Sequence, residues 1–155
     1  MDHVCNNLSI YIVSDQTGLI LRYKVKAQDF VRCGEAASKL KRALERLGAK
    51  PTAVRRVAIA SYEAETNLVI HTTRGGELIA EIQPQKIRIV SVDSGPGIPD
   101  IEKALVPGYS TAPEWIREMG FGAGMGLNNI QTCADQMHLS SKVNVGTRLE
   151  IFINL

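Results

Sequence analysis

The chain has 155 residues, which is the size of one domain. Its apolar content of 45% and charged content of 22% are ordinary for a soluble globular protein, and a net charge of +2 is too small to indicate nucleic-acid binding. The sequence shows no signal peptide, and no apolar run approaches the ~20 residues that span a bilayer. We therefore expect one cytoplasmic domain over residues 1–155 that binds neither nucleic acid nor membrane.

The three cysteines, Cys5, Cys33 and Cys133, stand far apart in the sequence and form no CxxC pair. An odd number of isolated cysteines argues against a disulfide framework and against a zinc site. It fits a reducing compartment such as the cytoplasm.

The N-terminal part of the chain predicts a β-hairpin. Residues 8–15 and 19–27 are typical of strands, and the sequence QTG between them is typical of a tight turn. We expect this hairpin to occupy residues 1–28.

Two helices are expected after the hairpin. Asp29 is a candidate N-cap, and apolar residues then recur at three- and four-residue spacing up to Leu47, as in an amphipathic helix. Gly48 is placed to end this helix, and Pro51 to open the next. The second helix, over residues 51–72, is apolar nearly all round and is therefore expected in the core.

Basic residues concentrate between positions 39 and 56, where they interleave with apolar ones: Lys39, Lys41, Arg42, Arg46, Lys50, Arg55 and Arg56. Such a pattern is usual for the solvated face of a surface helix. The alternative is a surface that meets an acidic partner protein.

The second half of the chain alternates strand and helix signals. The expected elements, in order, are strands over 77–83 and 86–93, a short helix over 100–105, a segment rich in Gly, Pro, Ser and Thr over 106–121, a helix over 124–137, and strands over 138–144 and 147–155. Because runs of strands are separate from runs of helices, the pattern predicts an α+β fold. We expect a two-layer sandwich with a mixed, mostly antiparallel sheet and helices on one face.

The expected core helix carries two polar residues in register. Glu63 and Asn67 stand four residues apart, so both project from the same face. Burying a carboxylate without a partner is unfavourable, so the pair needs an explanation. A partnered glutamate, or one at the edge of the apolar stripe, is one explanation, and a functional site is the other. Glu65 points elsewhere and is expected at the surface.

A first glycine cluster, VDSGPGI, follows an apolar strand that ends at Asp93. Gly95 and Gly97 let the backbone adopt unusual φ angles and let another group approach closely. A carboxylate at such a strand end can accept a hydrogen bond from an exocyclic amine such as that of adenine. A simple turn explains the same pattern equally well.

A second cluster, GFGAGMGL, places glycines at 120, 122, 124 and 126 directly before a helix. Exposed N–H groups at a helix N-terminus bind phosphate through hydrogen bonds and the helix dipole. No GK[ST] follows, so the cluster is not a P-loop. No βαβ unit with an acidic residue about 20 residues further on surrounds it, so it is a poor dinucleotide fingerprint.

These features occur in one order, ending in the sequence VGTRLEI that contains Gly146 and Thr147. In that order, over residues 50–155, the sequence resembles the GHKL, or Bergerat-fold, ATP-binding family of gyrase, MutL and histidine kinases. Within the family it is most similar to the small stand-alone bacterial anti-sigma and switch-protein serine kinases. The hairpin over 8–27 and the segment APEWIREM are both longer than those relatives usually have.

The resemblance implies a site for ATP and Mg²⁺. Asn67 matches the family's Mg²⁺ ligand and Glu63 its general base, while Asp93 would accept from the adenine amino group with support from Thr147. The other implied nucleotide-binding residues lie in the glycine clusters and between them: Gly95, Gly97, Ile98, Ser110, Thr111, Gly122, Gly124, Met125, Gly126 and Leu127.

The resemblance also implies that residues 106–121 form a lid that can close over the nucleotide. Arg117 is the one basic residue of this lid segment, and it either contacts a phosphate or is simply solvated. His71 and His138 are expected to have structural roles.

Three functions are compatible with this resemblance. The first is a serine/threonine kinase that phosphorylates a STAS-type protein in a partner-switching pathway. The second is a nucleotide-gated anti-sigma module that binds a partner, such as a sigma factor, without required catalysis. The third is the catalytic domain of a histidine kinase. A homodimer is expected from family likeness alone.

Overall fold

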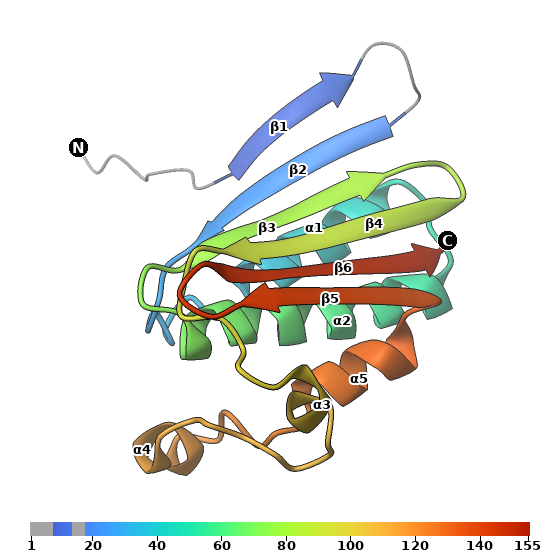
Figure 1. Cartoon of the computed structure of the whole chain (residues 1–155). Coiled ribbons are helices and arrows are strands. Elements are labelled where there is room, and N and C mark those ends of the chain that lie inside the picture. The colour runs from blue at the N-terminus through green and yellow to red at the C-terminus, as the bar shows by residue number, and fades with distance from the viewer. Residues whose placement is uncertain (1–7, 14–17) are drawn as a thin grey trace, which may run out of the picture.

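The structure, a computed structural model, describes residues 8–13 and 18–155 (Figure 1). The strands form one six-stranded sheet in the order β1-β2-β3-β4-β6-β5. Their bounds are β1 Leu8–Val13, β2 Gly18–Val25, β3 Gly76–Ile82, β4 Lys86–Asp93, β5 Gln136–Lys142 and β6 Gly146–Asn154. Residues 1–7, which include Cys5, and residues 14–17, which include the end of the expected first strand and most of the expected QTG turn, lie outside the described residues.

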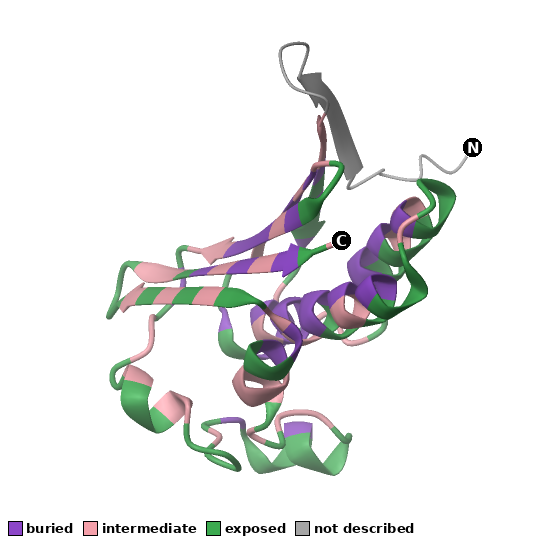
Figure 2. Cartoon of the chain, turned by 90° about the vertical axis from the view of Figure 1, so that its right-hand side faces the viewer, coloured by how far each residue is buried: buried purple, intermediate pink, exposed green. Residues whose placement is uncertain are grey.

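Helices cover one face of this sheet and leave the other open, which confirms the expected α+β sandwich (Figures 1 and 2). Their bounds are α1 Glu35–Arg46, α2 Pro51–His71, α3 Ile101–Ala104, α4 Glu114–Glu118 and α5 Gly126–Cys133. The long helix α2 packs between α1 and α5. The short helices α3 and α4 lie at one end of the molecule, at the bottom of Figure 1.

All five pairings between the described strands are antiparallel, so the parallel pair of a mixed sheet is not found among them. The short connection from β5 to β6 allows only an antiparallel pair, because parallel neighbours need a long crossover. Strand β6 also enters the sheet between β4 and β5. As a result β4 and β5, which run in the same direction, never pair.

The core lies between the sheet and α2. Ile87 and Ile89 of β4 and Ile151 of β6 are fully buried and belong to one apolar cluster with Val57 and Ala60 of α2. This arrangement explains the alternation of the strand sequences, because every second side chain faces the helices. It also explains why α2 is apolar nearly all round.

The open face of the sheet carries ion pairs instead of a second apolar layer. Arg88 lies 3.1 Å from Glu81 and 2.9 Å from Glu150, one on each neighbouring strand. Arg148 also pairs with Glu150 at 2.9 Å. Polar side chains at alternate positions therefore match this solvent-facing side.

The first helix begins later than expected. Gly34, with a φ of 94°, is its N-cap and offers no side-chain cap. Asp29 instead accepts a hydrogen bond from the backbone N–H of Arg32 at 3.3 Å, so it caps the preceding turn. The expected boundaries at the other end are confirmed, because Gly48 follows α1 with a φ of 77° and Pro51 is the first residue of α2.

Glu65 is not at the surface, which corrects the sequence-based expectation. Its side chain is 3% exposed and accepts backbone hydrogen bonds from Ala36 at 3.2 Å and Ala37 at 3.0 Å. The carboxylate therefore caps the N-terminus of α1 from the neighbouring helix. The sequence around Glu65 contains no sign of this, because its partners lie 28 and 29 residues away.

The last helix is shorter than expected, since α5 ends at Cys133 and β5 already begins at Gln136. Between them, Asp135 accepts the backbone N–H of Asn154 at 2.7 Å and pairs with Arg56 at 2.9 Å. These contacts fix Asp135 next to β6, just before the edge strand β5 begins, so the helix ends at Cys133.

The basic residues of positions 39–56 lie largely on the outside of α1 and α2. Lys39 pairs with Glu35 at 2.9 Å, and Lys41 and Arg46 are exposed. The solvated helix face is thus confirmed, and an acidic partner stays a prediction. Among the described residues, no helix is long and apolar enough to cross a membrane.

Candidate functional site

A cavity of about 400 Å³ lies at the end of the molecule where α2 and β4 end. Its walls come from α2, the loop after β4, the segment 106–121 and the start of α5. Twelve of the residues expected at the site line it: Glu63, Asn67, Asp93, Gly97, Ile98, Ser110, Thr111, Gly122, Gly124, Gly126, Leu127 and Thr147. Two do not: Gly95 is buried beside Asp93, and Met125 is exposed at the N-cap of α5.

Glu63 and Asn67 meet the N-terminus of α5. A Cβ placed on Gly126, the first residue of α5, would lie 3.2 Å from Glu63 Oε2 and 3.5 Å from Asn67 Oδ1. No side chain caps this helix, so its first N–H groups stay available next to a carboxylate and an amide. Such a helix end favours an anion, while the two side chains offer oxygen atoms to a cation.

Glu63 has a partner that sequence reasoning missed. Asn129, in the first turn of α5, donates a hydrogen bond from Nδ2 to Glu63 Oε1 at 2.9 Å. Its neighbour Asn128 donates to the carbonyl of Leu105 at 2.8 Å. The sequence did carry a signal for these contacts, namely two adjacent asparagines after the second glycine cluster. Asparagine is unfavourable inside a helix, so such a pair suggests side chains that bond outside it.

Asp93 sits at the opposite end of the cavity, at the last position of β4. One of its carboxylate oxygens accepts the backbone N–H of Gly95 at 2.8 Å. Across the sheet it pairs with Thr147 of β6, whose hydroxyl lies 2.8 Å from that of Ser141. Ser141 in turn accepts the backbone N–H of Ile98 at 2.7 Å, so a polar network surrounds the aspartate.

The close approach that the glycine clusters suggest is found at Gly97 and Gly124. Gly97 has a φ of 77°, and a side chain there would overlap the carbonyl of Lys142 in the β5–β6 turn. Gly124 has a φ of 78°, and a Cβ there would lie 2.5 Å from the carbonyl carbon of Gly108. The approach of Gly124 to Gly108 holds the start of the segment 106–121 next to the chain just beyond its end.

The segment 106–121, which we call the lid segment, contains the helix α4 that the sequence did not predict. Trp115 of α4 meets the ring of Phe30 edge-on, with 5.7 Å between the centroids, and Phe121 packs on the same Phe30 at 5.2 Å. Ile116 is buried against Ile70 at the end of α2. The lid segment is thus docked on the loop between β2 and α1.

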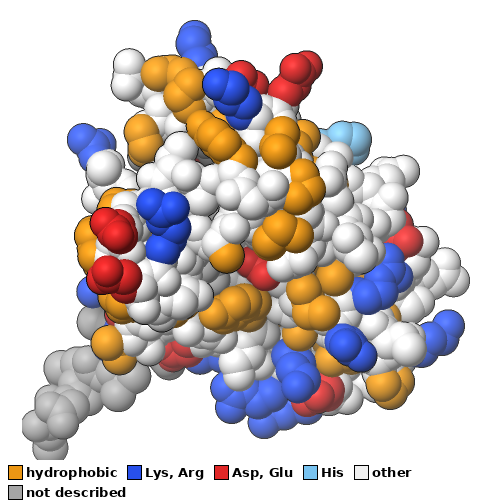
Figure 3. Space-filling view, turned by 90° about the horizontal axis from the view of Figure 1, so that it is seen from below, with side chains coloured by type: hydrophobic (Ala, Val, Ile, Leu, Met, Phe, Trp, Pro, Cys, Tyr) orange, Lys and Arg blue, Asp and Glu red, His pale blue; other side chains and the backbone are white. Residues whose placement is uncertain are grey.

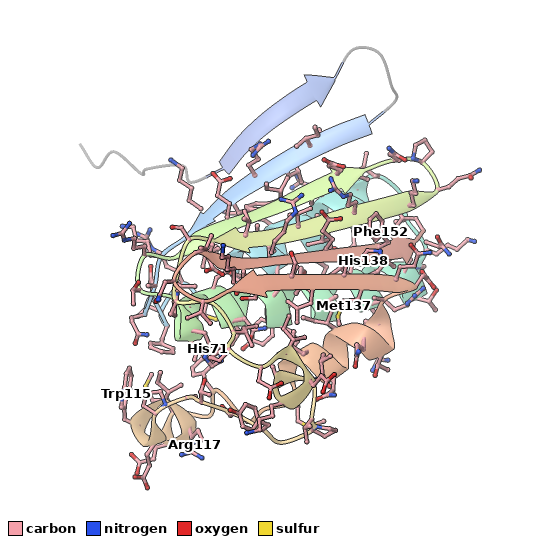
Figure 4. All side chains as sticks on the ribbon, viewed as in Figure 1. His71, Trp115, Arg117, Met137, His138 and Phe152 are labelled. Atoms are coloured by element: carbon pink, nitrogen blue, oxygen red, sulfur yellow. The ribbon has the colours of Figure 1, made fainter. Side chains whose placement is uncertain are left out.

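Figure 3 views the end of the molecule that carries α3 and α4, and shows apolar side chains spread over it with Lys and Arg at several places, the largest group at the lower edge of the view. The exposed apolar residues of the lid segment include Val106, Tyr109, Trp115 and Met119. Arg117 is exposed on α4 and does not line the cavity (Figure 4).

The two histidines take different places (Figure 4). His138 of β5 packs edge-on against Phe152 on the sheet, with 5.9 Å between ring centroids, and does not line the cavity. His71, the last residue of α2, lines the cavity. Lys103 of α3 lines it too, and the sequence pattern did not single it out.

Comparison with known proteins agrees with this geometry. The family model for the histidine kinase-like ATPase domain matches residues 27–153. The anti-sigma F factor of Clostridium kluyveri is 33% identical over 132 residues, which cover 81% of this chain and 84% of the relative. The serine/threonine-protein kinase RsbT of Bacillus subtilis is 30% identical over 98 residues, 61% of this chain and 68% of the relative. On its motif order, its sandwich and these matches, the chain belongs to the histidine kinase-like (GHKL) ATPase family.

Proposed function

We propose that the chain is an ATP-dependent serine/threonine protein kinase that phosphorylates a STAS-type regulatory protein in a bacterial partner-switching pathway. The observation that carries this proposal is the position of Glu63 and Asn67, which face the uncapped N-terminus of α5 in one cavity. In this proposal Glu63 would be the base, Asn67 the metal ligand and the start of α5 the phosphate site. The names of the relatives, an anti-sigma F factor and a serine/threonine-protein kinase, support the same class.

The adenine would bind at the Asp93 end of the cavity. One carboxylate oxygen of Asp93 already accepts the backbone N–H of Gly95. The other oxygen has no hydrogen-bond partner among the described residues, so it can accept from the amino group of the base. Gly97 lines the cavity close to this aspartate, and Thr147, opposite Asp93 on β6, would support it. The triphosphate would extend from there toward α5.

The phosphates would meet the start of α5, where Gly122, Gly124 and Gly126 expose backbone amides. Ser110 and Thr111 face the same space from the lid segment. The cavity would therefore hold the base of the nucleotide at Asp93 and its phosphates at the start of α5.

The donor set fits Mg²⁺. Among the described residues, no three His, Cys, Asp or Glu side chains gather into a metal site made by protein alone. Asn67 offers an amide oxygen that no described side chain occupies, and Mg²⁺ commonly takes few protein ligands and completes its shell with phosphates and water. Bound there, the ion would neutralise charge on the phosphates during transfer.

Glu63 would act on the acceptor hydroxyl. The oxygen of a serine or threonine side chain attacks the γ-phosphorus, the bond to the bridging oxygen breaks, and ADP leaves with that electron pair. The hydroxyl proton passes to the Glu63 carboxylate. Because phosphoryl transfer depends mainly on positioning and charge stabilisation, one carboxylate held at the right place is sufficient.

A nucleotide-gated anti-sigma module is the second candidate function. The anti-sigma F factor name of the 33% identical relative favours it, as do the exposed apolar residues of the lid segment, which could meet a partner such as a sigma factor. A histidine-kinase catalytic domain ranks third, and a homodimer is proposed from family likeness alone.

The kinase proposal is tested by incubating the chain with labelled ATP, Mg²⁺ and purified STAS-domain proteins. We expect phosphate on a serine or threonine of at least one of them. Nucleotide binding without transfer to any STAS protein would count against the kinase.

A Glu63→Gln variant separates the first two candidates. If partner regulation requires phosphoryl transfer, the variant should lose transfer and regulation together. The rate of transfer should fall by about 100-fold or more. If the variant still regulates its partner in an ATP-dependent way, the binding function is the principal one.

A further inference from the structure

Asn128 and Asn129 occupy the first turn of α5, a helix of only eight residues. Asparagine is unfavourable inside a helix, because its side chain competes for backbone hydrogen bonds. Here both side chains leave the helix and bond elsewhere. Asn128 reaches the carbonyl of Leu105 at 2.8 Å, and Asn129 reaches Glu63 Oε1 at 2.9 Å.

The contact with Asn129 makes the two oxygens of Glu63 different. Oε1 accepts the hydrogen bond, whereas Oε2 faces Gly126, whose Cβ position lies 3.2 Å away. An ionised carboxylate can only accept, so the amide must present its nitrogen to Oε1. Rotation of the carboxylate would break this bond, which leaves Oε2 directed toward the start of α5.

We infer that Asn129 is a positioning residue, which holds the Glu63 carboxylate in the orientation that receives the proton of the acceptor hydroxyl. The inference rests on the proposed function, because the orientation of Glu63 affects transfer only if Glu63 acts on the acceptor. The hydrogen bond from Asn129 to Glu63 joins α5, which carries the amides proposed to face the phosphates, to α2, which carries the proposed base. The two helices also pack together, and Arg56 of α2 donates to the carbonyl of Cys133 of α5 at 2.8 Å, but the Asn129 contact is the one that reaches the base itself.

A purely structural cross-link between α2 and α5 is the alternative explanation of the same contact. A cross-link and a positioning residue differ in what their loss changes. Loss of a cross-link lowers the unfolding midpoint and leaves the rate constant of transfer alone. Loss of a positioning residue lowers kcat with little change in ATP binding, and only while Glu63 is present.

The test uses a double-mutant cycle with Asn129→Asp and Glu63→Gln. Asp keeps the size of Asn129 but replaces the N–H donor with a second carboxylate, so the Glu63 carboxylate loses its donor and is repelled. We expect kcat for transfer to the STAS acceptor to fall about 10- to 100-fold, the scale of a misplaced catalytic group. Affinity for Mg²⁺-ATP, measured by calorimetry, should change by less than about threefold. In the Glu63→Gln background the same substitution should cause no further loss.

Gln131→Glu is the matched control, since it makes the same amide-to-carboxylate change at an exposed position of α5. It should leave kcat unchanged. An Asn129→Asp variant with wild-type kcat, or with an equal loss in both Glu63 backgrounds, would overturn the inference.

A second measurement separates this inference from the proposed function. In NMR spectra, the side-chain amide signals of Asn129 should shift in a Glu63→Ala variant while those of Asn128 stay in place. If no acceptor is phosphorylated but this selective shift occurs, the kinase proposal fails and the Asn129 contact with Glu63 stands. If the Asn129 signals do not move, the positioning inference fails whatever the activity.

Discussion

Glu65 of α2 accepts a hydrogen bond of 3.0 Å from the backbone N–H of Ala37, in the first turn of α1. The other oxygen accepts from Ala36 at 3.2 Å, and Gly34 at the N-cap offers no side chain to do so. Glu63, only two residues away, faces the cavity instead. Neighbouring carboxylates of one helix therefore serve different tasks, one in the fold and one in the proposed site.

Replacement of Glu65 by alanine should destabilise the fold, because it leaves two buried N–H groups of α1 without an acceptor. We expect the free energy of unfolding to fall by about 1–3 kcal/mol. Urea unfolding followed by circular dichroism measures it. Glu45→Ala, at an exposed position of α1, the helix that Glu65 caps, is the control and should change the free energy by less than about 0.5 kcal/mol. Equal effects of the two substitutions would contradict the capping role.

The stability contribution of Glu65 should also depend on pH. Burial raises its pKa, against the lowering effect of the N–H groups of Ala37 and Ala36. The unfolded chain therefore releases this proton at lower pH than the folded one, and the contribution of Glu65 to stability falls as pH rises through the folded pKa. Glu65→Gln removes this titration.

Unfolding of the wild type and of Glu65→Gln should be compared from about pH 4 to about pH 8. We expect the stability of the wild type relative to the variant to decrease as pH rises across this range. A relative stability that increases with pH would show that the hydrogen bonds outweigh burial.

Asn67→Ala should weaken Mg²⁺-ATP much more than adenosine, because only the former needs the proposed metal ligand. The loss should be about tenfold or more for Mg²⁺-ATP, the scale of a contact to a charged group. Calorimetry with both ligands measures the difference, and adenosine is the internal control. Equal losses for the two ligands would place Asn67 outside the metal site.

Gly124→Ala should be more harmful than Gly120→Ala, although both glycines have a positive φ. A Cβ on Gly124 would lie 2.5 Å from the carbonyl carbon of Gly108, whereas one on Gly120 would meet nothing within 4 Å. Both variants carry a backbone penalty of about 1 kcal/mol, and only the first must also move Gly124 away from Gly108 of the lid segment. Thermal unfolding and ATP affinity should both show the larger loss for Gly124→Ala. Equal unfolding midpoints would argue against the close approach of these two glycines.

Phe30→Leu should loosen the lid segment from the loop that precedes α1. The single tryptophan of the chain, Trp115, meets Phe30 edge-on and is 49% exposed, so its fluorescence reports this contact. We expect emission at longer wavelength and a loss of about 1 kcal/mol in unfolding free energy. Phe152→Leu, on the open face of the sheet, should leave the emission unchanged. Emission that responds to neither variant would contradict the docked position of α4.

Much of the fold could be predicted because its signals are local. The alternation of residues 86–93, the helical spacing that ends at Gly48, and Pro51 at the start of α2 all act within a few residues. The candidate site residues were singled out by glycine clusters and a four-residue spacing, which are readable without the fold, and their roles were expected from the order of these motifs and the family resemblance. The structure brings most of them to one cavity.

Other features arose only from contacts between distant segments. Nothing near Glu65 shows that its partner is the first turn of α1, and nothing near Asn129 shows that it faces Glu63, 66 residues earlier in the chain. The end of α5 and the docking of Trp115 on Phe30 have the same origin. The sequence by itself indicated most of the strands and helices and singled out the candidate site residues, since propensity, periodicity and motif spacing depend on near neighbours. Tertiary structure decided which side chains are buried and which hold the others in place, because packing distances depend on the whole chain.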